Sequence, residues 1–244
     1  MNIDTFHKML ESATLIVERG SVVYQTPTMY SDRDILVVVP DEYKSITESG
    51  KNGIVEYIAP SPSVDVTNND YQFVCESDFQ KMIDDCTVLA IETLCTPIEH
   101  VLYTDTAKHK FKAPLYKEWN DCTMFDFDKW KVRQQFSTTA SNSWAKAHKK
   151  MTVEKDLDMY RGQKSLFHSL RILMFANQVC RFGYITDFHE ARDLWYEIYD
   201  PLNKLTWEDY KAKYKPLYNK LHSELAVLSP KPVESKNSHI ISNI

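Results

Sequence analysis

The sequence predicts an α+β (α/β) fold in which a small mixed sheet with helices is followed by a helical domain. Short apolar runs rich in β-branched residues gather before residue 75, whereas helical periodicity dominates after residue 115, and the strongest helical stretch spans residues 163–183. We therefore expect a core domain over residues 1–114, a helical domain over residues 115–228 and a flexible polar tail over residues 229–244.

The composition is that of a globular protein. The chain has 244 residues, of which 43% are hydrophobic and 26% charged, enough to bury a sizeable core. It has no signal-peptide pattern and no apolar run of membrane-spanning length, which predicts a soluble cytoplasmic protein without a membrane partner. Its five cysteines show no CxxC spacing, so neither a disulfide framework nor a zinc ribbon is expected. The net charge of −5 means that nucleic acid could bind only at a local basic patch.

The first half is predicted to hold the sheet. A helix is expected over residues 4–11, and β-prone runs occupy residues 13–21, 34–40, 53–59 and 70–74. The run at 34–40 is apolar on both faces, which is typical of a central strand covered by helices on both sides. Ser77 can cap a following helix, and residues 88–94 form a further apolar helical segment.

The second half is predicted to be helical from about residue 115. The helix within residues 163–183 ends at Gly183, a C′ glycine. Asp187 and Glu190 stand at capping-box spacing before the next helix, and a last helix over residues 206–228 is expected to be interrupted at Pro216. The acidic pair in "FDFDKW" (residues 125–130) is interpreted as a loop or helix start.

Two acids stand at the entrance of the central strand. Asp32 and Asp34 are two residues apart, so their side chains would point to the same side if the strand includes both. Like charges this close are unfavourable unless a cation lies between them, and Mg²⁺ accepts carboxylate oxygens together with substrate phosphates. Gly20 allows a close approach of the backbone to a phosphate, and Ser21 adds a hydroxyl and an N–H. A third acid on a neighbouring strand would complete a two-metal site.

The segment "GSVVYQTPTMYSDRDI" (residues 20–35) resembles the hG[GS]…Dh[DE]h signature of the DNA polymerase β superfamily of nucleotidyltransferases. It is more specifically similar to the GS-R-A-Y-G…SD-x-D-h segment of the minimal branch, which includes a polymerase-β-like protein associated with RNA repair. The residues that agree are Gly20, Ser21, Tyr24, Ser31, Asp32 and Asp34. Val22 replaces an arginine of that segment, Gln25 replaces a glycine, and Arg33 stands where a more apolar residue is common.

The resemblance also implies a position for the third acid. The segment "CTVLAIETL" (residues 86–94) is similar to the N-P-T-V-L-E-x-L segment of the branch, and counting back from Glu92 gives Asp70. Asp65 and Glu56 also lie on β-prone stretches and rank second and third.

A second resemblance lies in the predicted helix at residues 163–183. Lys164, His168 and Arg171 are spaced at i, i+4 and i+7, which places three potential cations on one stripe. The plain alternative is a solvated face. The branch shows a similar K-x-x-x-H-x-x-R helix behind its active site, and the resemblance implies contacts to a nucleoside triphosphate.

The resemblance implies a magnesium-dependent nucleotidyltransferase that moves a nucleoside monophosphate from a triphosphate, with ATP expected, to an acceptor hydroxyl and releases pyrophosphate. The acceptor stays open between an RNA end, a small molecule and a protein. The implied site residues are Asp32, Asp34 and Asp70 for catalysis and for two Mg²⁺ ions (or Mn²⁺), and Gly20, Ser21, Ser31, Lys164, His168 and Arg171 for the nucleotide.

Two other functions are alternatives to this one. A catalytically idle member of the same fold, acting as a binding or regulatory protein, is consistent with the departures at Val22 and Gln25. A DxD glycosyltransferase would use Asp32 and Asp34 to hold Mn²⁺ and a nucleotide sugar. Its nucleotide-binding fold needs a longer α/β unit than the stretch that precedes Asp32.

Overall fold

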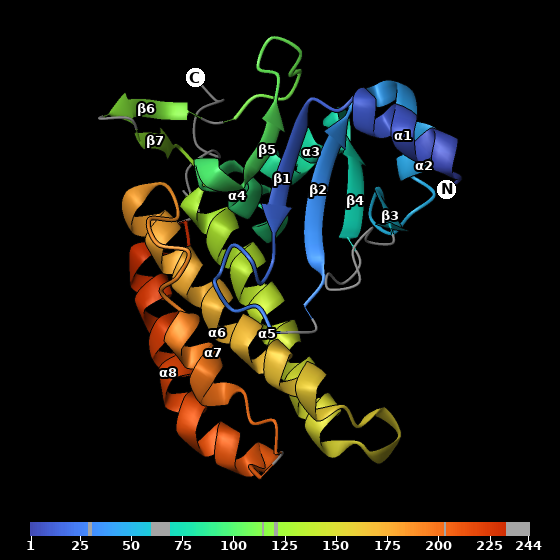
Figure 1. Ribbon diagram of the computed structural model, residues 1–244. Helices are drawn as coiled ribbons and strands as arrows, with labels where there is room; N and C mark the ends of the chain where they lie inside the picture. The colour runs from blue at the N-terminus through green and yellow to red at the C-terminus, as the bar shows by residue number, and fades with distance from the viewer. Residues whose placement is uncertain (29–30, 60–68, 114, 120–121, 203, 233–244) are drawn as a thin grey trace, which may run out of the picture.

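The computed structural model describes residues 1–28, 31–59, 69–113, 115–119, 122–202 and 204–232. It confirms an α+β fold: a five-stranded mixed sheet with helices on both faces lies beside a group of long helices (Figure 1). The strands of the sheet are β1 (Leu15–Arg19), β2 (Arg33–Val39), β3 (Ile54–Ala59), β4 (Asn69–Cys75) and β5 (Val101–Thr104).

The sheet has the order β3-β4-β2-β1-β5, so β2 is its central strand. β2 runs parallel to β4 and antiparallel to β1, while β3 and β5 pair antiparallel with β4 and β1 at the two edges. Ile35 to Val39 are all buried, as the apolar run predicted. The four predicted strands are thus confirmed. The edge strand β5 was not predicted, because its residues are mostly exposed and show no alternation of apolar and polar side chains.

Helices cover both faces of the sheet. Phe6 and Met9 of α1 (Ile3–Glu11) pack on the face that includes Val37 and Phe73, and the ring of Phe6 stacks on Tyr57 at 4.3 Å. The opposite face packs against two helices, α3 (Glu76–Asp84) and α4 (Val88–Leu94). The short elements between them are η1 (Asp41–Tyr43), α2 (Lys44–Thr47) and η2 (Ile98–His100). The site acids project from the face that α3 and α4 cover.

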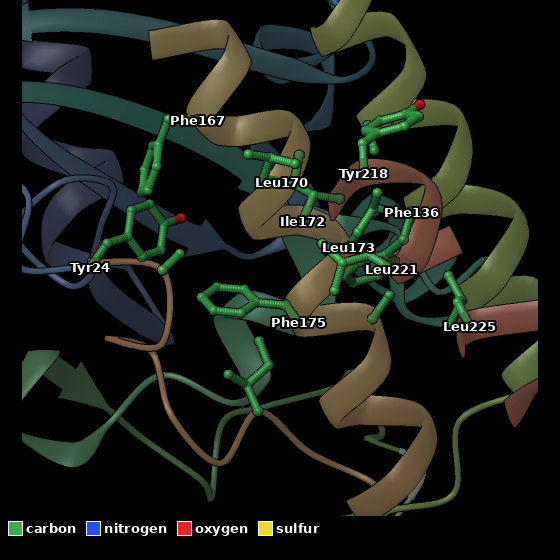
Figure 2. Close-up of a cluster of buried hydrophobic side chains, with 14 of the residues drawn as sticks. Tyr24, Phe136, Phe167, Leu170, Ile172, Leu173, Phe175, Tyr218, Leu221 and Leu225 are labelled. Carbon is green, nitrogen blue, oxygen red and sulfur yellow. The ribbon is translucent and has the colours of Figure 1, made fainter. Parts of the chain in front are cut away.

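The helical part is built around α6. Its members are α5 (Lys129–Thr152), η3 (Glu154–Asp156), α6 (Met159–Phe182), α7 (Arg192–Ile198) and α8 (Trp207–Leu228). α6 is buried over most of its length, and Figure 2 shows its apolar side chains packed with those of α5 and α8. Gly183 ends α6 with a φ of 80°, as predicted. None of the helices in the described ranges is long and apolar enough to cross a membrane.

Three boundary predictions are wrong. Residues 115–125 hold a hairpin, β6 (Leu115–Trp119) and β7 (Cys122–Phe125), where helices were expected. Cys75, and not Ser77, is the N-cap of α3, because the backbone of β4 runs directly into that helix. α7 begins after Ala191 without a side-chain cap, since the Glu190 carboxylate is bound to the Gln178 side chain.

Three further predictions concern the last helix, the start of α5 and the tail. The prediction that Pro216 interrupts the last helix is wrong: α8 continues through Pro216, which is exposed, so the carbonyl that loses its N–H partner lies on the solvent side of the helix. Asp128 of the "FDFDKW" segment is the N-cap of α5, in agreement with a helix start. At the start of the predicted tail, Ser229 is buried and its hydroxyl donates to the Lys129 carbonyl at 2.7 Å. Residues 233–244 of that tail lie outside the described ranges.

Candidate functional site

The turn after β1 brings backbone groups against an acid of β2. Within residues 20–26, the Tyr24 N–H donates to the Gly20 carbonyl at 3.2 Å and the Thr26 N–H donates to the Ser21 carbonyl at 2.9 Å. Gly20 has a φ of 73°, and a Cβ atom placed there would collide with Oδ2 of Asp34. Only glycine therefore allows the Asp34 carboxylate to lie against this turn.

Gln25, which departs from the resembled segment, has a left-handed backbone conformation. Its φ of 53° lies in the left-handed region that glycine favours. Its side chain accepts a hydrogen bond from Arg192 at the start of α7.

The sheet register places Asp34 beside Asp70. The two are direct partners in the parallel pair of β2 and β4, so their side chains project from the same face. The expectation that Asp32 and Asp34 point to the same side depended on both acids lying in the strand. β2 begins at Arg33, so it includes Asp34 but not Asp32, which precedes it and is exposed. Among the described residues, none of these three carboxylates forms a hydrogen bond or an ion pair with another side chain or with the backbone.

The surroundings of Asp34 and Asp70 disfavour the charged forms of these two acids. Burial raises the pKa of Asp34; Lys164 and Arg19 oppose this shift, while the negative charges of Asp70 and Asp32 add to it. Burial also raises the pKa of Asp70, with further increases from Asp32 and Glu56. A cation placed among the carboxylates would remove this repulsion.

Glu56 and Asp65 are the alternatives to Asp70 as the third acid of the site. Glu56 lies on β3, two strands from Asp34, is exposed, and accepts a hydrogen bond from Gln72 at 3.3 Å. Asp65 lies outside the described residues. Of the described candidates, Asp70 is therefore the one whose backbone adjoins that of Asp34.

A pocket of about 440 Å³, counted out to its open mouth, joins the turn to the helical part. Its lining comes from the turn, from β2, and from one face each of α6 and α7: Gly20, Ser21, Tyr24, Thr26, Ser31, Asp34, Tyr160, Lys164, Phe167, His168 and Trp195. Six of the nine predicted site residues are in this set. Lys164 lines the pocket together with Asp34, and its charge opposes the rise in the pKa of that acid.

The stripe of three cations on α6 is only partly as predicted. Burial and the nearby charges of Arg171 and Lys164 lower the pKa of His168 well below its ordinary value, so this imidazole is neutral at pH 7. Arg171 is 4% exposed and does not line the pocket. Its guanidinium donates to the Glu92 carboxylate at 2.6 Å, so the predicted direct contact with a triphosphate is not what this geometry favours. Of the three, only Lys164 presents a charge to the pocket.

Arg33, the departure between the two acids, points away from the pocket. Its guanidinium donates to the carboxylate of Glu18 on β1, which also lies 2.9 Å from Nδ1 of His100. Burial alone would raise the pKa of Glu18, but the hydrogen bonds from His100 and Arg33 lower it on balance. Successive residues of a strand point to opposite faces of the sheet, so Arg33 pairs with Glu18 on the face opposite to Asp34.

Several lining residues were missed by the sequence analysis. Tyr160 and Phe167 share the helical face of Lys164, so the spacing of i, i+4 and i+7 already contained a signal for them. Thr26 lies in the turn beyond the matched motif. Trp195 comes from α7, and nothing in the sequence indicated that this helix would reach the turn.

The residues at this site have the chemistry that Mg²⁺ needs. Hard divalent ions take carboxylate oxygens, and Asp34 and Asp70 offer theirs from one face of the sheet with no competing partner among the described residues. Over the same ranges, no three acidic, histidine or cysteine side chains are already gathered as a set of metal ligands.

Comparisons with known proteins give loose structural likenesses. No model of a protein family and no curated protein matches the sequence. The fold is similar to that of a nucleotidyltransferase-like protein from Exiguobacterium sibiricum, at 13% identity and a TM-score of 0.29, over 93% of this chain and 74% of that one. It is also similar to an aminoglycoside 6-adenyltransferase from Bacillus subtilis, at 11% identity and a TM-score of 0.30, over 92% and 88% of the two chains. At these TM-scores the likeness carries no argument about function.

Proposed function

We propose that the protein is a metal-dependent nucleotidyltransferase that transfers a nucleoside monophosphate from a nucleoside triphosphate, ATP in the first instance, to an acceptor hydroxyl. The observation that carries this proposal is the meeting of Asp34 and Asp70 beside a turn that only Gly20 permits, opposite the cation Lys164. Carboxylates that repel one another and have no other partner among the described residues, next to a pocket that Lys164 also lines, suit a metal-bound polyphosphate.

Each residue has a part in this proposal. Asp32, Asp34 and Asp70 would hold two Mg²⁺ ions, which supply charge neutralisation for the phosphates and for the leaving pyrophosphate. Asp70 would also help to remove the proton of the acceptor hydroxyl. Lys164 would pair with a phosphate oxygen as a point charge. Nδ1 of the neutral His168 lies 3.4 Å from the Arg171 guanidinium and accepts from it, so His168 would offer the N–H of its other ring nitrogen as a donor.

The turn would bind the phosphates through backbone and hydroxyl groups. The Ser21 hydroxyl lines the pocket, and the positive φ of Gly20 exposes backbone at its entrance. Ser31 lines the same pocket, and its hydroxyl accepts from the Thr28 N–H at 2.8 Å. The acceptor remains open between an RNA end, a small molecule and a protein.

The variant Asp34→Asn tests the proposal. It keeps the shape of the side chain but removes a metal ligand, and transfer of label from [α-³²P]ATP to acceptors in a total cell extract with Mg²⁺ should fall by about a hundredfold or more. Asp126→Asn is the matched control, since Asp126 belongs to the other acidic pair and is exposed. Unchanged transfer in Asp34→Asn would contradict the proposal.

The same assay separates the alternatives. Metal-dependent binding of ATP without any transfer would indicate a catalytically idle binding protein. Incorporation of label from a nucleotide sugar in place of ATP would indicate a glycosyltransferase.

A further inference from the structure

The turn of residues 20–26 is attached to the helical part by one buried carboxylate. Glu92 on α4 is 4% exposed. One of its oxygens accepts from the Arg171 guanidinium of α6 at 2.6 Å, and the other accepts from the Tyr24 hydroxyl at 2.7 Å. The second oxygen also lies 3.8 Å from the guanidinium of Arg19, the last residue of β1. Glu92 therefore contacts the turn both in its middle and at the residue that precedes it.

Tyr24 is held on its ring as well as on its hydroxyl. The Arg171 guanidinium lies over the ring at 3.8 Å from its centre, and the ring of Phe175 meets it edge-on at 6.0 Å. Figure 2 shows Tyr24 beside α6, on the side of that helix that carries Phe167 and Phe175. Burial and the charge of Glu92 raise the pKa of Tyr24, so its hydroxyl keeps the proton that it donates. These contacts fix one rotamer of a side chain that belongs to the turn.

The arrangement has a consequence for the acid of β2. The turn carries Gly20 at one end, and the Asp34 carboxylate lies where a Cβ of Gly20 would be. A shift of the turn therefore either opens the pocket or collides with Asp34. Buried hydrogen bonds to a charged group resist such shifts more strongly than bonds between neutral groups do.

We propose that Tyr24 is a positioning residue, clamped by Glu92 and Arg171, that holds the turn of residues 20–26 at the distance from Asp34 at which the pocket can accept a phosphate. Tyr24 acts through the backbone of the turn, and Glu92 acts through Tyr24. The functional half of this inference rests on the proposed nucleotide-transfer activity. The structural half concerns only the order of the turn.

Tyr24→Phe is the primary variant, because it removes one hydroxyl and leaves the pair of Glu92 and Arg171 intact. The amide hydrogens of residues 24–26 should exchange roughly tenfold faster than in the wild type, measured against amides of β2 in the same sample. Tyr210→Phe is the matched control: Tyr210 is 1% exposed and its hydroxyl donates to the Ile198 carbonyl at 2.9 Å, away from the turn. That variant should lower Tm by a similar amount without faster exchange in residues 24–26.

Glu92→Gln separates positioning from general stability. It leaves Arg171 without its countercharge, so Tm should fall further than in Tyr24→Phe. The glutamine amide can still bond to the Tyr24 hydroxyl, so the protection of residues 24–26 relative to β2 should stay within about threefold of the wild type. If protection in the turn instead follows Tm across the three variants, or does not change in Tyr24→Phe, the inference is wrong.

Nucleotide binding gives the functional readout. By calorimetry with a non-hydrolysable ATP analogue and Mg²⁺, Tyr24→Phe should raise Kd about tenfold, and Tyr210→Phe should leave it unchanged. An unchanged Kd in Tyr24→Phe would overturn the positioning role. If the wild type itself binds no nucleotide, the proposed function fails, while the exchange experiment still decides whether Glu92 and Tyr24 order the turn.

Discussion

Two groups of charged side chains border the turn at residues 20–26, and they are built in opposite ways. In one, the single carboxylate of Glu92 is contacted by two guanidinium groups and one hydroxyl, and the residue is only 4% exposed. In the other, burial and nearby carboxylates raise the pKa values of Asp34 and Asp70, and neither these two acids nor Asp32 form a hydrogen bond or ion pair within the described residues.

The difference indicates which group stabilises the fold and which is kept for a ligand. A buried charge that is fully paired holds elements together, whereas like charges gathered without partners reduce stability and are expected where a ligand will supply the missing charge. Glu92 thus joins α4, α6 and the turn, whereas Asp34 and Asp70 have no partner among the described residues.

The largest effect should come from breaking the paired group. Glu92→Ala leaves the buried guanidinium of Arg171 without a partner and should lower the free energy of unfolding by about 3–5 kcal/mol, measured by urea denaturation. Glu197→Ala is the control, because the ion pair of Glu197 with Lys213 is exposed and should contribute less than about 1 kcal/mol. A loss of stability in Glu92→Ala no greater than in this control would remove the distinction between the two groups.

The unpaired group should respond to Mg²⁺ and to pH. Because the pKa values of Asp34 and Asp70 are raised above the ordinary 3.8, the folded state binds more protons than the unfolded state, and this contribution to stability falls as pH rises through the window above 3.8. Mg²⁺ should therefore stabilise the protein at pH 7 by about 2.7 kcal/mol at a hundred times its Kd, and by less at pH 4.5.

Thermal unfolding with and without Mg²⁺ measures this effect. Asp34→Asn isolates it from other titrating groups, since the variant should be about 1 kcal/mol more stable than the wild type without metal at pH 7 and should gain little from Mg²⁺. A gain from Mg²⁺ that is the same in the variant, or that does not depend on pH, would show that the ion binds elsewhere.

Gly20→Ala should disturb the contact between the turn and Asp34. An alanine would be strained in the left-handed backbone conformation of Gly20, and its Cβ would collide with Oδ2 of Asp34. Stability should therefore fall by about 2 kcal/mol, and nucleotide binding should be lost. Gly183→Ala is the control, because Gly183 also has a positive φ but lies at the end of α6. It should lose stability by about 1 kcal/mol through strain alone and bind nucleotide as the wild type does.

The smallest effect is expected at Gln25. Gln25→Gly relieves the left-handed strain of this residue but adds backbone freedom to the unfolded chain, so it should raise the free energy of unfolding by only about 0.5 kcal/mol. Chemical denaturation measures the change, and nucleotide binding should not weaken. A clear loss of stability would mean that the hydrogen bond between Gln25 and Arg192 outweighs the strain.

The sequence was sufficient for much of the sheet. Apolar runs bounded by polar turns predicted four of its five strands, because burial on both faces leaves a continuous signal, as in residues 35–39. The short edge strand β5 and the hairpin of β6 and β7 gave no such signal, since edge positions accept mixed side chains. The spacing of Gly20, Ser21, Asp32 and Asp34 also indicated a candidate site, and the structure lines one pocket with three of these residues, Gly20, Ser21 and Asp34.

Contacts between distant segments depended on the tertiary structure. The sequence could not choose between Asp70, Asp65 and Glu56 by spacing alone, because which strand lies next to β2 follows from the packing of helices on both faces of the sheet. The sequence also could not show which of Lys164 and Arg171, on the same face of α6, would line the pocket. α4 lies against the Arg171 end of that face and supplies Glu92, so one cation is neutralised in the interior and the other is left at the pocket. Local patterns determine which residues are available, whereas burial and charge pairing determine which of them remain free to act.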